Sequence, residues 1–289
     1  MRYIFLSLFL SVFIFNKAKA FEWPEWLNKP IYSNDDDNIR HKRLLVKGIG
    51  LAYQLSNYDA KSSNGISSQW DNTSNLGLDT DLIINITDRL WFRWNGAITV
   101  LFAGDAILVN NGASSFLSGP VGTNGDAQLV IGYDIARFSK IDIGLYGGLY
   151  KGGSINYASS GNSNMYVENL WLGGVLGTNL TYYAEDMINI LFAEYYITYL
   201  VGDQSAHQNG SAYNSSFANS IPAMGFGIGG STEIKVSGNF WVKPFAKFQA
   251  MFAGALSGTY DTAAGSVIAS NLGTANFEVM TVGVDLNWR

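Results

Sequence analysis

The chain has 289 residues, of which 47% are hydrophobic and only 14% are charged, whereas soluble domains usually carry about 25% charged residues. The formal net charge of −5 offers no basic surface of the kind that nucleic-acid binding requires, so no nucleic-acid partner is expected. Cysteine is absent, which excludes disulfide bonds, thiol nucleophiles, cysteine-based metal sites and a lipid-modified N-terminal cysteine.

The first twenty residues have the pattern of a secretory signal. Arg2 supplies the positive n-region, residues 3–15 are apolar residues and serine, and Ala18-Lys19-Ala20 matches the small-x-small cleavage pattern. The apolar run is too short for a spanning helix, which needs about 20 residues. We therefore predict a signal peptide over 1–20 and a mature chain that starts at Phe21.

A segment over 21–43 follows the predicted signal and precedes the first predicted strand. Its aromatic residues Trp23 and Trp26 could form an interfacial element or enter the barrel lumen. The acidic stretch 34–38 lacks the glycine and the distal glutamate of an EF-hand loop, which favours a solvated linker over a calcium site. We expect no metal site and no cofactor.

From about residue 44 onward, ten runs alternate apolar and polar residues with a period of two. The runs cover 47–55, 75–86, 90–102, 128–135, 141–149, 170–180, 191–199, 224–235, 242–252 and 280–288. A tilted strand crosses a membrane with about 9–11 residues, and a closed sheet pairs every backbone N–H and C=O group. The pattern therefore favours strands whose apolar face meets lipid.

The connections between these runs alternate between short and long. Four are tight turns, at 87–89, 139–140, 184–186 and 237–239, and five are long and rich in Gly, Ser and Asn, at 56–73, 105–126, 151–167, 202–220 and 254–275. This asymmetry is typical of barrels with short turns on one side of the membrane. The predicted fold class is all-β, a transmembrane antiparallel β-barrel over 44–289 with about ten strands, short periplasmic turns and long outer loops. The alternative is a soluble β-sandwich or barrel with a dry core.

Aromatic residues gather at the strand ends, as in the two girdles of a membrane barrel. The predicted girdle comprises Trp91, Tyr182, Tyr183, Trp241 and Trp288. The opposite strand faces carry the predicted lumen-lining charges Asp79, Asp81, Arg93, Asp134, Asp142, Glu194, Glu233, Lys235, Lys243 and Lys247. These charges either pair and seal the lumen or leave a thin aqueous path, and ten strands favour the sealed state because eight already fill a barrel. Pro244 predicts a bulge or weak point in its strand.

The chain resembles bacterial outer-membrane β-barrel proteins as a class, through the signal at 18–20, the ten alternating strands and the final strand over 282–289. Members of this class usually end on an aromatic residue that the assembly machinery recognises, whereas here Trp288 is followed by Arg289. The resemblance implies localisation in the outer membrane and contact with its lipid. It also implies that the segment over 21–43 and the tight turns lie in the periplasm, and that the outer loops are open to an extracellular ligand.

The ten-stranded omptin surface proteases of this class use an acidic pair in one outer loop and an Asp-x-His pair in a facing loop. Here Asp79-Thr80-Asp81 lies within a strand, Asp105 has no acidic partner at that spacing, and Asp203 and His207 are separated by three residues. We therefore predict no catalytic residues and a non-enzymatic surface or structural barrel. A narrow porin-like channel is the alternative, and an omptin-like or lipid-modifying enzyme, in which Ser205 could join His207, is the weaker one.

Overall fold

The computed structural model describes residues 45–61, 66–87, 89–110, 113–138, 140–184, 186–208, 211–254, 258–262, 265–269 and 274–289. The side chains of 61–68, 109–113, 203–220 and 255–273 are not among those described. The predicted signal peptide over 1–20 and the predicted segment over 21–43 also lie outside the described residues. Within the described ranges, no helix reaches the length and apolarity needed to cross a membrane.

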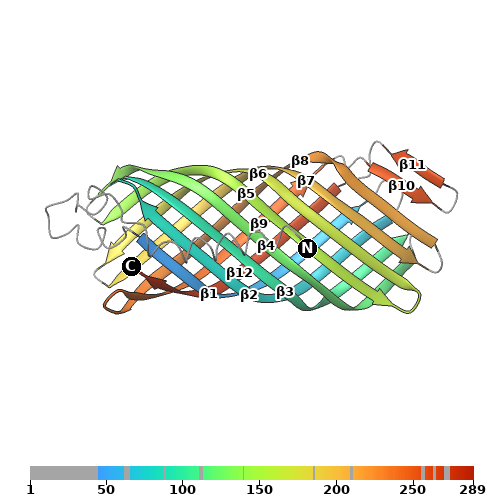
Figure 1. The fold of residues 1–289 in the computed structure, drawn as a ribbon, viewed down its shortest axis with the longest axis horizontal. Coiled ribbons are helices and arrows are strands. Elements are labelled where there is room, and N and C mark those ends of the chain that lie inside the picture. Colours follow the sequence, from blue (N-terminus) through green and yellow to red (C-terminus); the bar gives the residue numbers. More distant parts are fainter. Residues whose placement is uncertain are drawn as a thin grey trace, which may run out of the picture.

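Ten antiparallel strands form one closed ring (Figure 1). They are β1 (Leu45–Lys61), β2 (Ile66–Asn85), β3 (Leu90–Asn110), β4 (Ala113–Arg137), β5 (Ile141–Ser160), β6 (Ser163–Ala184), β7 (Met187–Gln208), β8 (Ser211–Ser237), β9 (Phe240–Ala253) and β12 (Thr274–Trp288). Neighbours in sequence pair from β1 to β9, and β12 closes the ring by pairing with both β9 and β1. The predicted ten-stranded antiparallel barrel is therefore confirmed.

The two ends of the barrel differ. One end, here called the turn end, holds the tight connections after β2, β4, β6 and β8 together with the C-terminus, on the left in Figure 1. The other, here called the hairpin end, carries β10 (Gly258–Thr262) and β11 (Gly265–Ala269). These two strands pair with each other, and β10 also pairs with the distal part of β8.

The predicted long outer loops are largely wrong, because most of these residues continue the barrel strands. At the hairpin end, only residues 62–65 separate β1 from β2, and only residues 111–112 separate β3 from β4. The strand β4 alone has 25 residues. Such a strand is about 80 Å long and, at a tilt of about 40°, rises about 60 Å. The apolar band of a membrane barrel is only about 25 Å tall, so the hairpin-end half of the wall projects beyond it.

The alternation of side chains continues toward the hairpin end, and on β6 the apolar face changes from the outside of the ring to the inside. On β6, the turn-end half carries Leu180 outward and Thr181 inward, whereas the hairpin-end half carries the partly exposed Glu168 and the buried Val167. Lipid selects apolar side chains on the outside of the first half. Water surrounds the second half, where apolar side chains are buried inside the ring instead.

The outer surface of the turn-end half is a continuous belt of apolar side chains, each more than one third exposed. The belt includes Leu51, Leu78, Val100, Ile131, Leu149, Leu176, Leu191, Ile228, Phe248 and Val284. A soluble monomer rarely exposes an apolar patch of more than a few hundred Å². The belt therefore fits a barrel surrounded by lipid and argues against the soluble alternative.

Pro244 interrupts a ladder without creating a bulge there. Between β8 and β9, Ser231 pairs with Phe245 and Ile234 pairs with Val242, so both strands advance by three residues and neither has an extra one. The one register shift between these strands lies farther on, between Lys235 and Ser237. Proline has no N–H group to donate to the neighbouring strand. The expected bulge is therefore replaced by a gap in pairing.

Candidate functional site

The charged side chains of the barrel strands meet in the interior of the ring, because alternate residues of every strand point inward. Seven of the ten predicted lumen residues are buried: Asp79, Asp81, Asp134, Asp142, Glu194, Glu233 and Lys243. The side chains of Arg93 and Lys247 are 27% and 12% exposed and join the same interior clusters. Lys235 differs, since it lies at the turn end and pairs with the exposed Asp186 at 3.7 Å.

The central cluster is built around Asp81 on β2. Its carboxylate accepts from Arg93 Nε at 2.9 Å and from Lys243 Nζ at 2.7 Å. Lys243 also lies 2.5 Å from the carboxylate of Asp285, on β12. Lys243 comes from β9, so this cluster joins β9 and β12 to β2 and β3 across β1, where the two ends of the sheet meet.

A second cluster surrounds Glu194 on β7, nearer the hairpin end. The carboxylate pairs with Lys247 at 3.3 Å and accepts from Tyr146 at 3.0 Å, from Gln128 at 3.2 Å and from Tyr196. Donors from three other strands and from β7 itself thus converge on one buried acid. A buried charge with this many partners is stabilised in place, whereas the same charge unpaired would cost several kcal/mol.

A third cluster stands at the turn end, where Arg137 bridges two acids. Its guanidinium lies 3.0 Å from Asp134 and 3.2 Å from Asp142. Trp91 donates from its indole Nε1 to Asp134 at 3.1 Å. Arg137 ends β4 next to a register shift at 134–136, and this shift turns its side chain toward the acids.

The last interior cluster at the turn end is formed by the C-terminal residue. The Arg289 guanidinium pairs with Glu233 and stacks on Trp241, with 4.0 Å between the guanidinium carbon and the ring centroid. Trp241 packs with Tyr183 and Ile188 in a small apolar cluster. Together these side chains occupy the interior beside the tight turns.

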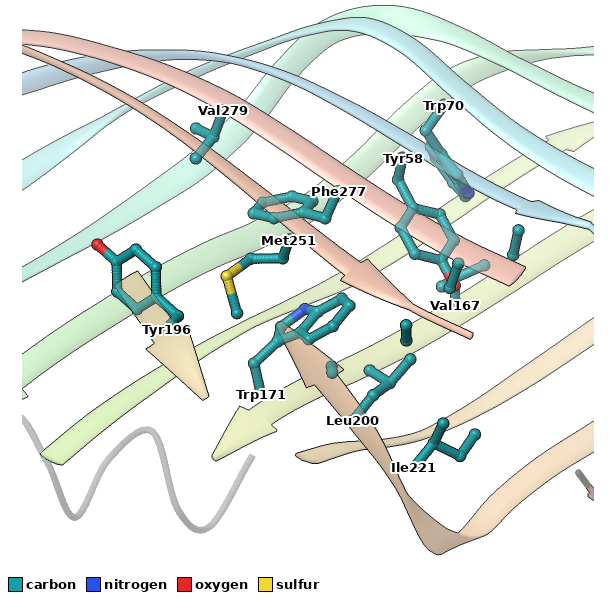
Figure 2. Packing of buried hydrophobic residues seen from close by; sticks show 14 of the residues in the cluster. Tyr58, Trp70, Val167, Trp171, Tyr196, Leu200, Ile221, Met251, Phe277 and Val279 are labelled. Carbon is teal, nitrogen blue, oxygen red and sulfur yellow. The ribbon is translucent and has the colours of Figure 1, made fainter. Parts of the chain in front are cut away.

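The hairpin-end half of the interior is a packed apolar core (Figure 2). Trp171, Leu200, Met251 and Phe277 point toward one another from different strands. A hydrogen bond of 3.2 Å from Tyr58 on β1 to Asn169 on β6 crosses the ring to its opposite side. The lumen is therefore filled by side chains through this half.

A cavity of about 70 Å³ remains in the middle of the barrel, between the charged clusters. Its lining includes Asp79, Asp81, Asp126, Lys243 and Lys247. A water molecule needs about 10–15 Å³ of such volume, so the cavity has room for only a few waters. A solute of ordinary size does not fit.

The predicted aromatic girdle is corrected at three of its five positions. Tyr182 and Trp288 are 38% and 45% exposed and face outward, but Tyr183 and Trp241 are buried inside the ring, and Trp91 packs inward against Tyr146 with ring centroids 5.6 Å apart. Consecutive residues of a strand face opposite sides, so Tyr182 and Tyr183 cannot both meet lipid. The sequence correctly places these aromatic residues at strand ends, but three of them face the interior instead of the lipid.

The residues weighed for an omptin-like site are spread over different surfaces. Asp79 and Asp81 lie inside the barrel. Asp105 is exposed and pairs in register with Asp71, next to the inward Trp70 and Ala106, so these two acids face outward. His207 lies on β7, but its side chain is outside the described ones, as are those of Asp203 and Ser205.

Several partners in these clusters were missed from sequence. Asp285 occupies an inward position in the alternation of its strand, so the sequence alone could have assigned it to the lumen-lining residues. Asp126 was placed in a loop that proves to be strand. Tyr146 and Tyr196 are inward and serve as hydrogen-bond donors, a role that alternation alone does not reveal. Arg289 gave no signal, because a single residue at a strand end has no period.

No protein-family model matches the chain, and no curated protein matches it in sequence. Among solved structures, the outer membrane protease OmpT from Escherichia coli is 11% identical, with a TM-score of 0.67 over 84% of this chain and 96% of that protein. The outer membrane protein OprG from Pseudomonas aeruginosa is 11% identical, with a TM-score of 0.35 over 85% and 95%. The similarity to OmpT shows the fold, which is that of outer-membrane β-barrel proteins, and confirms the class-level resemblance.

Proposed function

We propose that this chain is a non-enzymatic outer-membrane barrel with a sealed lumen, which anchors a wall of long strands raised on the outer side of the membrane. The apolar belt would contact outer-membrane lipid, and the final strand with Trp288 would be recognised by the barrel assembly machinery. The raised rim would be the part available to an extracellular ligand.

The observation that carries the sealed state is the set of side-chain contacts that cross the interior. Tyr58 bonds to Asn169 on the opposite strand, Gln249 donates to Tyr150 at 2.7 Å from four strands away, and Lys243 reaches Asp81 from three strands away. These contacts lie at different levels of the barrel. An ion would have to break a buried contact at each level, which costs about 1–3 kcal/mol for a neutral hydrogen bond and several kcal/mol for the pair of Lys243 and Asp81.

The matching experiment is conductance of the refolded protein in a planar bilayer. We expect no discrete current steps from protein that is folded by gel mobility and by β-sheet circular dichroism. Reproducible steps would support the channel alternative instead. In that case, replacing Lys243 and Lys247 by methionine should change ion selectivity, because both lysines line the remaining cavity.

Location and orientation can be tested in intact cells. An epitope inserted between β3 and β4, at the hairpin end, should be labelled by antibody on whole cells. The same epitope inserted between β6 and β7, at the turn end, should be labelled only after the outer membrane is permeabilised. The opposite labelling pattern would contradict the proposed orientation, and labelling of neither epitope before permeabilisation would contradict surface display.

A further inference from the structure

The charged interior contains more acids than bases. The connected clusters around the cavity hold Asp79, Asp81, Asp126, Glu194, Glu233 and Asp285 against Arg93, Lys243, Lys247 and Arg289. Among the described side chains, these six carboxylates outnumber the four cationic groups by two. A buried carboxylate is stable only with a proton or a cation beside it.

Asp79 is where this excess is concentrated. It is 9% exposed and lines the cavity, yet among the described residues it has no hydrogen bond and no ion pair. The nearby cations are engaged elsewhere: Arg93 with Asp81, Lys243 with Asp81 and Asp285, and Lys247 with Glu194 and, at 4.0 Å, with Asp126. Asp79 therefore presents an unpartnered carboxylate to a small polar cavity.

A glycine on β1 lies between Asp79 and a second acid, Asp285. Gly50 on β1 pairs in register with Asp79 on one side and with Asp285 on the other. A Cβ atom at Gly50 would overlap the Asp285 carboxylate and the backbone of Val284. The missing side chain thus lets the two carboxylates face the lumen across a gap of two strand spacings, about 10 Å between backbones.

We propose that the cavity binds a monovalent cation such as sodium, held by the Asp79 carboxylate and by water, with Asp126 on the cavity wall. The cavity of about 70 Å³ accommodates one ion and a few waters. Calcium takes six to eight oxygen ligands, and in the described part of the chain no group of three or more acidic or histidine side chains is placed to supply them. This site does not depend on the sealed-lumen function, since a closed or a conducting barrel could hold the ion.

The test is thermal unfolding of the full chain, refolded in detergent, at fixed ionic strength and scan rate. Sodium chloride replaces N-methylglucamine chloride stepwise while the fraction of heat-resistant protein is read by gel mobility. We expect the midpoint to rise saturably by about 2–4 °C in sodium. The rise should vanish in Asp79→Asn and persist in Asp186→Asn, which removes an exposed acid at the turn end.

A midpoint that does not respond to sodium, or an equal response in wild type and Asp79→Asn, overturns the proposal. Dependence on pH alone, abolished in Asp79→Asn, would also overturn it by identifying a proton as the occupant. Should Asp79→Asn fail to fold, sodium NMR relaxation on the wild-type barrel decides. A sodium relaxation rate that is higher than in protein-free buffer, and that falls when potassium is added, supports the site. No increase in the relaxation rate refutes the site. Conductance is measured separately, so either proposal can fail alone.

Discussion

Lys243 on β9 donates to Asp81 on β2 at 2.7 Å, although the two residues are 162 positions apart in the chain. The contact spans the β9–β12, β12–β1 and β1–β2 ladders, where the two ends of the sheet meet. Arg93 completes the pairing of Asp81, and Asp285 completes that of Lys243. The buried network therefore stabilises the closure of the ring.

Replacing Lys243 by methionine should destabilise the barrel by about 3–5 kcal/mol, because it leaves Asp285 buried without its cation. The free energy of unfolding in urea, measured in lipid vesicles, gives this value. Lys235→Met is the matched control, since its pair with Asp186 is solvent-exposed and contributes at most about 1 kcal/mol. Equal losses in the two variants would contradict a special role for the central cluster.

Two outward residues of β4 test where the membrane ends. Ile131 and Phe116 are 56% and 72% exposed, but they lie about 15 Å and 50 Å from the turn end along the barrel axis. Ile131→Arg should cost about 2–4 kcal/mol, because it places a charge near the middle of the bilayer. Phe116→Arg should change the stability by no more than about 0.5 kcal/mol, as at an ordinary surface position.

The same urea titration in vesicles compares these two variants. A large loss for Phe116→Arg would mean that the apolar band extends over the raised wall. A small loss for Ile131→Arg would mean that the belt is not surrounded by lipid.

Adjacent residues of β6 test the apolar core of the raised wall. Trp171 is buried inside the ring, while Leu172 is 40% exposed on the outer surface. Trp171→Ala should cost about 3–5 kcal/mol, because it opens a cavity among Leu200, Met251 and Phe277. Leu172→Ala should cost clearly less, because surrounding molecules fill the space. Urea midpoints of the two variants check the order, which reverses if the strand faces are exchanged.

The architecture was predictable where lipid dictates the pattern. Residues such as Ile131 and Leu176 must be apolar on the outside of a membrane barrel, so a period of two identifies both the strand and its outward face. The raised wall was not predictable in the same way. Its outer face is not uniformly apolar, as Glu168 shows, and apolar residues such as Met165 and Val167 point inward. A search for apolar outer faces therefore interpreted these strands as loops.

The sequence predicts which charged side chains point into the interior, but not which of them contact one another. Alternation alone places Lys243, Glu194 and Asp81 inside. That Lys243 meets Asp81 depends on the tilt and register of the closed ring, which a single strand does not encode. The aromatic girdle failed for a related reason, because position near a strand end does not say whether Trp241 or its neighbour Phe240 faces lipid.

The pair formed by Glu233 and Arg289 should behave as one unit in a double-mutant cycle. Glu233→Gln and Arg289→Met should each destabilise the barrel, because each leaves a buried charge without its partner. The double variant should lose less than the two single losses combined, with a coupling of about 0.5–3 kcal/mol. Arg289→Lys should restore only part of the stability, since lysine keeps the charge but loses the planar stacking on Trp241. Urea unfolding in vesicles supplies all four values, and additive losses would mean that the two side chains act separately at the turn end.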